Sequence, residues 1–213
     1  MYKFKNTGSI TKGFLVAAIM AAFSVFSGCG SNSSSVSGAV VKEPKGDVQA
    51  KVSSDSTYKP IKENDILSSG GAVKTAENST VKLLFAEKAE VYIKPESYFE
   101  IKSGENLGKQ MGGTAVYRVN KQKDSIKIET PQGVTAVLGT VFLLDITSTS
   151  TTLIVEEGKV SFTNIDGLST EVNPGEKLVA AAKGKSDPVS KLDPIAREKL
   201  FNPGGSDAKI NQH

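Results

Sequence analysis

Apolar residues recur at every second position through residues 130–164, the most regular stretch of the chain. The alternating positions are Val134, Ala136 and Leu138, then Phe142, Leu144 and Ile146, then Leu153 and Val155, then Val160 and Phe162. A period of two over about four to eight residues is typical of half-buried strands, because successive strand side chains point to opposite faces. Gly133, Gly139 and Gly158 separate the runs, and Glu157-Gly158 is a candidate hairpin tip. The stretch is therefore predicted to be β-sheet.

The same alternation fills residues 39–101 and continues just before the regular stretch. The positions are Val48, Ala50 and Val52; Val81, Leu83 and Phe85; Val91 and Ile93; Phe99 and Ile101; and Ile126 and Ile128. Many short strands without a helical period predict an all-β fold, which is a sandwich, a barrel or a short β-helix. The glycine-rich residues 103–113 are expected to be a solvated loop, since no helix pattern follows them as a phosphate-binding turn requires.

Two elements are expected towards the C-terminus. A last strand is predicted around the turn at residues 173–175, with the apolar positions Val172, Leu178 and Val179. Asp193-Pro194 can begin one short helix, with aspartate as the N-cap and proline at the first helical position. The apolar residues of this helix are expected to dock on the sheet: Ile195, Leu200 and Phe201.

The first residues have the architecture of a secretory signal. Three lysines precede the uncharged residues 13–26, a run shorter than the ~20 residues of a membrane-spanning helix. Cys29 follows Phe26-Ser27-Gly28, which resembles the bacterial lipobox with phenylalanine in place of the usual leucine. The resemblance implies cleavage before Cys29 and acylation of its thiol, so that several acyl chains hold the protein on a lipid bilayer. The alternative is a free buried cysteine, which the flexible Ser/Gly tract that follows disfavours.

These signals divide the chain into four parts. We expect a signal peptide at residues 1–28, a tether at 29–38, one all-β domain at 39–182, and an extension with the short helix and a disordered tail at 183–213. Cys29 is the single cysteine, so no intramolecular disulfide can form and the core must supply the stability. The 26 basic residues exceed the 23 acidic ones only through three lysines of the signal. Nucleic acid is therefore not an expected partner.

No arrangement for catalysis stands out in the sequence. The single histidine is His213, the last residue, which disfavours both a Ser/His/Asp triad and a Cys/His metal site. Glu156 and Glu157 are neighbouring acids, but neighbours on a strand face opposite ways and solvation is the simpler interpretation. The hydroxyl-rich residues 147–152 are expected to be a solvated connection. We expect no enzyme, cofactor or metal; an enzyme would need a buried carboxylate pair in a cleft.

Three motifs, in order, resemble the FecR domain family. They are T-P-x-G at Thr130-Pro131-Gln132-Gly133, G-T-x-F at Gly139-Thr140-Val141-Phe142, and V-x-E-G-x-V at Val155-Glu156-Glu157-Gly158-Lys159-Val160. The resemblance extends more loosely to residues 61–85, where Asn64 replaces the family's usual glycine, and residues 86–89 replace its Asp-Gly turn. A structural role is expected for the motif residues: Thr130, Pro131, Gly133, Gly139, Thr140, Phe142, Glu157 and Gly158.

The resemblance implies protein interaction, scaffolding or signal sensing. In the best-known family members, an inner-membrane protein receives a signal from an outer-membrane transporter and controls an extracytoplasmic sigma factor. Only a few residues precede the signal peptide here, so we expect no sigma-binding segment and no direct anti-sigma activity. We expect an envelope protein partner, which adds a strand to an exposed sheet edge.

The alternative ligand is a cell-wall glycan or another polysaccharide. Such a ligand would need exposed, coplanar aromatic rings in a groove, for which the candidates are Tyr92, Tyr98 and Tyr117. Gly30 stands where an aspartate signals inner-membrane retention in enterobacterial lipoproteins. The outer membrane is therefore the preferred location, with the domain facing the periplasm or the cell surface.

Overall fold

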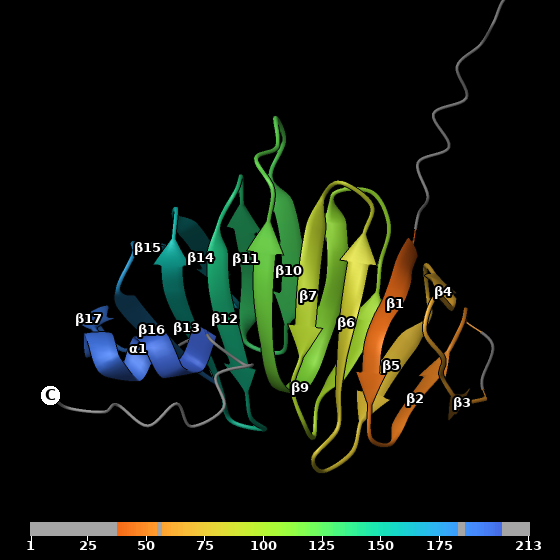
Figure 1. The fold of residues 1–213 in the computed structure, drawn as a ribbon. Coiled ribbons are helices and arrows are strands. Elements are labelled where there is room, and N and C mark those ends of the chain that lie inside the picture. The colour runs from red at the N-terminus through yellow and green to blue at the C-terminus, as the bar shows by residue number, and fades with distance from the viewer. Residues whose placement is uncertain (1–37, 55–56, 183–185, 202–213) are drawn as a thin grey trace, which may run out of the picture. The chain divides into compact units, whose positions relative to one another are not determined.

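The structure, a computed structural model, describes residues 38–54, 57–182 and 186–201. Within these residues the chain forms strands β1 to β17 and one helix, α1 (Pro194–Phe201). Two open sheets lie face to face and appear as a front and a back layer in Figure 1. The predicted all-β fold with one short C-terminal helix is confirmed, and of the architectures considered it is the sandwich.

Sheet A and sheet B each contain nine strands, one of which they share. In spatial order, sheet A consists of β4 (Ile66–Ser68), β1 (Gly38–Lys45), β6 (Thr80–Phe85), β7 (Ala89–Ile93), β9 (Asn106–Val119), β12 (Val141–Ile146), β13 (Ser150–Glu157), β16 (Glu176–Ala181) and β17 (Ser190–Lys191). Sheet B consists of β3 (Lys59–Pro60), β2 (Val48–Lys51), β5 (Ala72–Thr75), β8 (Tyr98–Ile101), β9, β10 (Ile126–Thr130), β11 (Gly133–Val137), β14 (Val160–Asn164) and β15 (Ser169–Val172). All of these pairings are antiparallel except that of β9 with β10.

Strand β9 belongs to both sheets. Its first half pairs with β8 and β10, and its second half pairs with β7 and β12. The strand changes sheet at Gly112-Gly113, where Gly113 has φ +73° and a Cβ would lie 2.2 Å from Ser97 Oγ. Only glycine fits this left-handed, crowded position. The prediction of a solvated loop holds for residues 103–105, which form an exposed turn, and was wrong for residues 106–113, where the glycines let a strand bend and approach its neighbours.

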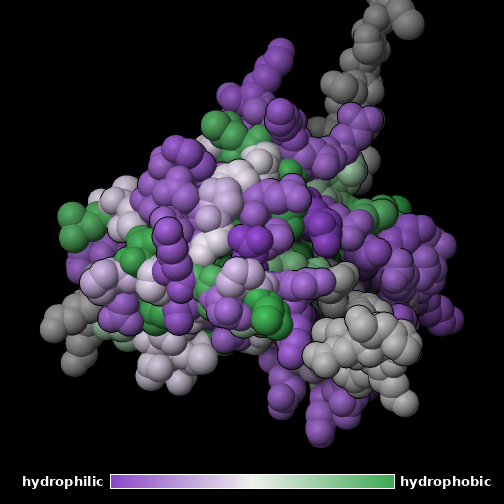
Figure 2. All heavy atoms as spheres, turned by 60° about the vertical axis from the view of Figure 1, so that its left-hand side comes forward, coloured by the Kyte–Doolittle hydropathy of each residue, from purple (hydrophilic) through white to green (hydrophobic). Residues whose placement is uncertain are grey.

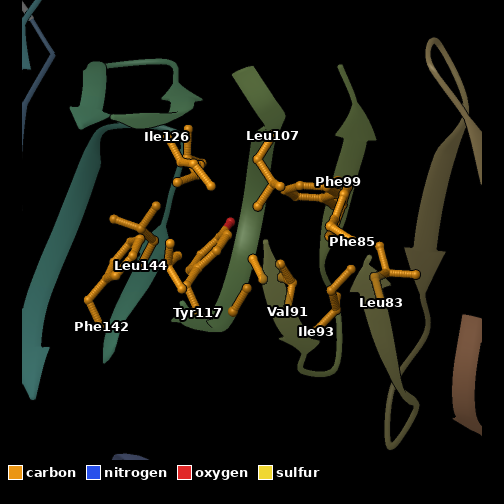
Figure 3. Packing of buried hydrophobic residues seen from close by; sticks show 14 of the residues in the cluster. Leu83, Phe85, Val91, Ile93, Phe99, Leu107, Tyr117, Ile126, Phe142 and Leu144 are labelled. Atoms are coloured by element: carbon orange, nitrogen blue, oxygen red, sulfur yellow. The ribbon is translucent and has the colours of Figure 1, made fainter. Parts of the chain in front are cut away.

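A buried polar pair fixes the bend in β9. The hydroxyl of Tyr117 donates to Gln110 Oε1 (2.7 Å), and Gln110 Nε2 donates to Gly113 O (2.7 Å). Both side chains are fully buried, and burial raises the pKa of Tyr117, so its hydroxyl stays protonated and can donate. The Tyr117 ring stacks on Phe142 with centroids 4.8 Å apart (Figure 3). The two halves of one strand are thus joined inside the core.

Most predicted inward positions do form the core between the sheets. Leu83, Phe85, Val91, Ile93 and Phe99 are buried together (Figure 3), as are Ile126, Ile128, Phe142, Leu144, Leu153, Val155, Val160 and Phe162. Strand β11 has the opposite phase from the one predicted. Thr135 and Val137 are buried while Leu138 is 54% exposed, because Thr135 Oγ1 donates to Ile128 O (3.1 Å) and so can be buried without an unpaired hydroxyl.

Helix α1 lies on the outer face of sheet A. Asp193 Oδ2 accepts hydrogen bonds from the backbone N–H groups of Ile195 and Ala196, both 3.0 Å, which confirms the predicted N-cap. Phe201 is buried and Leu200 is half-buried against the sheet. Ile195 was also expected to dock, but it is 67% exposed, since it lies on the helix face away from the sheet.

Candidate partner-binding edge

The motif residues lie where the chain turns or changes sheet. The turn at Pro131-Gln132 joins β10 to β11, and Thr130 Oγ1 donates to Gly133 O across it (3.0 Å). A Cβ on Gly133 would lie 2.3 Å from Thr163 O, so β14 packs directly on this glycine. Phe142 is fully buried in the core. This placement describes turns and packing, not a reactive centre.

Glu157-Gly158 was predicted to be a hairpin tip, and the structure corrects this. Strand β13 belongs to sheet A and β14 to sheet B, so Gly158 carries the chain from one sheet to the other. Gly158 has φ +76°, and a Cβ there would lie 2.6 Å from Gly139 O and 2.7 Å from Thr140 Cγ2. The second and third motifs therefore meet at this crossing, because Gly139 and Thr140 form the opposite crossing from β11 to β12.

Glu156 and Glu157 were expected to face opposite ways, but both line one cavity beneath α1. The register of β12 with β13 shifts so that Val141 faces Glu157 and Phe142 faces Val155. Such a bulge breaks the alternation and re-aims the side chains. Glu156 Oε2 lies 2.9 Å from Arg197 Nε, so this carboxylate is held in an ion pair.

The tyrosines proposed as a glycan platform do not come together. Tyr117 is in the core, Tyr92 lies beneath α1 on sheet A, and Tyr98 lies on the outer face of sheet B. Beside Tyr98, the Lys74 ammonium lies 4.0 Å from the ring centroid of Tyr58 and 5.6 Å from that of Tyr98. A lysine thus occupies a ring face of Tyr58 that a sugar would need.

Sheet B has an open edge at β15. The N–H of Asn164 donates to Leu168 O (3.0 Å), so these two residues form a hydrogen-bonded pair at the start of the β14–β15 pairing. Hydrogen-bonded and non-hydrogen-bonded pairs alternate from there along β15. Thr170 and Val172 therefore face β14, whereas the N–H and C=O groups of Ser169 and Glu171 face outward. Among the described residues, no backbone hydrogen bond reaches these outward groups. An open row of donors and acceptors of this kind is a template for another strand.

Side chains around β15 add features that could give specificity. A cavity of about 360 Å³ lies next to Glu171 and is lined also by Leu138, Lys159 and Ser161. At the other end of the strand, Leu168 is 68% and Ile165 is 56% exposed. Lys159 Nζ lies 2.8 Å from Glu171 Oε1. A strand added to β15 would therefore run past the exposed Leu168 at one end and the Lys159–Glu171 ion pair at the other.

Figure 2 turns this side of the sheets towards the viewer. Apolar side chains appear as separate green spots divided by hydrophilic ones, and no broad apolar patch is seen on this face. Recognition by main-chain hydrogen bonds suits such a surface better than burial of a large apolar area. The last strand predicted around residues 173–175 is in fact two strands in different sheets, β15 and β16, and of β15 only Val172 was predicted. The signal for β15 was Asp166-Gly167, a turn pair between the residues that form β14 and β15.

Other kinds of site are poorly supported within the described ranges. No group of three or more His, Cys, Asp or Glu residues could hold a metal ion there. No helix among the same residues has both the length and the apolar character to cross a membrane. Cys29, the predicted signal peptide and His213 lie outside the described residues. The lipidation site therefore stays a prediction.

Comparison with known proteins supports the resemblance seen in the motifs. The FecR protein family model matches residues 71–161, a range that includes all three motifs. No curated protein matches the chain. Two crystal structures of a candidate anti-sigma factor from Parabacteroides distasonis are similar in fold, each with a TM-score of 0.51 and 14% identity. Each match covers 57% of this chain and 60% of that protein, and at this identity it shows the fold alone.

Proposed function

We propose that this chain is a non-catalytic, lipid-anchored module of the bacterial cell envelope that binds a protein partner in signal sensing or regulation. The match to the FecR family over residues 71–161 supports a sensing or regulatory role, and the similar fold of a candidate anti-sigma factor agrees with it. The observation that carries the proposal is the open edge of β15, with outward N–H and C=O groups at Ser169 and Glu171. The partner adds an extended segment to this edge.

The anchor in this proposal is the acylated thiol of Cys29. Cells that express wild type and Cys29→Ser are fractionated, and the mature N-terminus is analysed by mass spectrometry. Acylated Cys29 in the outer-membrane fraction, absent from the variant, is the expected result. A product cleaved elsewhere and found in the soluble fraction would contradict the anchor while leaving the binding edge untouched.

The binding edge is tested with two substitutions at one residue. Glu171→Pro removes the outward N–H, whereas Glu171→Ala keeps it; both remove the ion pair with Lys159. A photo-crosslinking amino acid at the exposed Leu168 records partner contact in cells. We expect adducts in wild type and Glu171→Ala, and a loss of about tenfold in Glu171→Pro, because strand addition depends on the main-chain bonds.

The two variants must have similar thermal unfolding for this contrast to count. The N–H of Glu171 faces away from β14, so proline there removes no bond of the β14–β15 ladder. Equal adduct yields from folded Glu171→Pro and Glu171→Ala would contradict strand addition at β15.

A further inference from the structure

The outer face of sheet A carries an apolar row that the chain covers with its own last helix. The row crosses four neighbouring strands in register: Tyr92 on β7, Val116 on β9, Leu143 on β12 and Ile154 on β13. Lys82 and Lys177 stand at its two ends on the adjoining strands. The row and Phe201 of α1 form a cluster separate from the core between the sheets. It is therefore a distinct apolar surface with a charged border.

Helix α1 covers this row with few side chains. Phe201 is 6% exposed and Leu200 is half-buried, whereas most of the preceding helix residues are exposed. A cavity of about 400 Å³ lies between the helix and the sheet, lined among others by Pro194, Val141 and Arg118. A helix of this length is marginal in water by itself. Its stability therefore depends on a docking contact that is concentrated at one end.

Glu156 and Lys94 make polar contacts with α1 that another helix could also make. Glu156 binds the guanidinium of Arg197, as described above. Lys94 Nζ donates to Leu200 O (3.0 Å) at the C-terminal end of the helix, where carbonyl groups lack partners within the helix. Burial lowers the pKa of Lys94. The Glu156 carboxylate can bind the guanidinium of any arginine placed like Arg197. The Lys94 ammonium group can bind the C-terminal carbonyl groups of any helix that ends at this place.

We propose that the apolar row is a binding surface for a short helix of a partner protein, and that α1 is its resident occupant. The partner helix carries two adjacent apolar side chains about one turn after an arginine, as Arg197, Leu200 and Phe201 do in α1. It displaces α1, because two helices cannot use Glu156 and Lys94 at once. This surface lies on the face of sheet A and is independent of the edge of sheet B.

A labelled peptide of residues 190–203 serves as the probe. The full chain, purified in detergent, is titrated with the peptide as wild type and as Leu200→Asp/Phe201→Asp, and fluorescence polarisation reports binding. We expect the double variant to bind at least about tenfold more tightly than wild type, since its own helix no longer competes. A peptide that carries the same two aspartates should not bind.

Ile195→Asp is the matched control, because it places the same charge on an exposed position of α1. It should bind the peptide as weakly as wild type. A folded double variant that fails to bind, or a wild type that binds equally well, would overturn the proposal. If the double variant does not fold, hydrogen exchange of wild type tests whether α1 leaves its surface on sheet A. The amides of α1 should exchange at least about tenfold faster than those of β12 and β13, and equal protection would overturn the inference.

Discussion

The two sheets end differently at their C-terminal edges, although β15 and β16 follow each other in the chain. In sheet A the outer side of β16 is occupied: Glu176 and Lys177 pair with β17, and the N–H of Asp187 donates to Val179 O (2.8 Å). In sheet B the outward groups of β15 have no such partner among the described residues. Natural proteins commonly cover or blunt their edges. Residues after β16 thus cover the edge of sheet A, and no described residue covers the edge of sheet B at β15.

The largest expected difference between the two edges is in stability. Leu178 on β16 is 1% exposed, whereas Leu168 beside β15 is 68% exposed. Leu178→Ala should lower the free energy of unfolding by about 2–5 kcal/mol, because it leaves a cavity in the core. Leu168→Ala should change it by less than about 0.5 kcal/mol. Urea unfolding of both variants checks the pair, and comparable losses would show that β15 is as enclosed as β16.

A smaller effect is expected where α1 covers sheet A. Asp193→Ala removes the oxygen that accepts the two N–H groups at the start of the helix. The cost should be about 1 kcal/mol of helix stability. Hydrogen exchange should show faster exchange in α1 with unchanged protection in β15. Asp193→Asn keeps an acceptor and is the control; if it behaves like alanine, capping is not the cause.

The smallest effect concerns the turn that connects the two edges. Hydrogen bonds from the backbone N–H and the side-chain amide of Asn173 to Glu176 Oε2, 2.8 and 3.1 Å, lower the pKa of Glu176 below its usual 4.5. A lowered folded-state pKa means that this contact stabilises the turn above about pH 4.5 and is lost as the pH falls through the folded-state value.

The Asn173 amide is therefore expected to exchange faster with falling pH below 4.5, after correction for intrinsic exchange, while the core amides do not change. In Glu176→Gln this pH dependence should disappear. A pH dependence that persists in Glu176→Gln would assign the titration to another group.

Local pattern predicted much of the fold because half-burial leaves an alternation in the sequence. Phe142, Leu144, Leu153 and Val155 were placed correctly, as was the cap at Asp193. The phase of β11 was wrong, since apolar residues occur on both of its faces and only the hydrogen bond of Thr135 decides which face is buried. Which distant strands pair with each other cannot be predicted from a local pattern of this kind.

The candidate site was less predictable for a physical reason. Strand addition at an exposed edge was anticipated, but which edge is open depends on what the rest of the chain leaves uncovered. Ser169 and Glu171 are not unusual residue types. They matter because β15 pairs with β14 on one side and with no other described strand. The surface under α1 was also hidden, because Tyr92, Val116, Leu143 and Ile154 come from four separate segments.

The bend in β9 also has a consequence for the kinetics of folding. Because one continuous strand supplies pairing partners in both sheets, a sheet that pairs with its half of β9 also brings in the half that the other sheet needs. The two layers are therefore expected to form in a single cooperative step, with no intermediate in which one sheet stands alone. Folding dominated by pairing between distant segments takes on the order of milliseconds to seconds. During that time the backbone groups at the edges of both sheets, near β15 and β17, would be open to pairing with another chain.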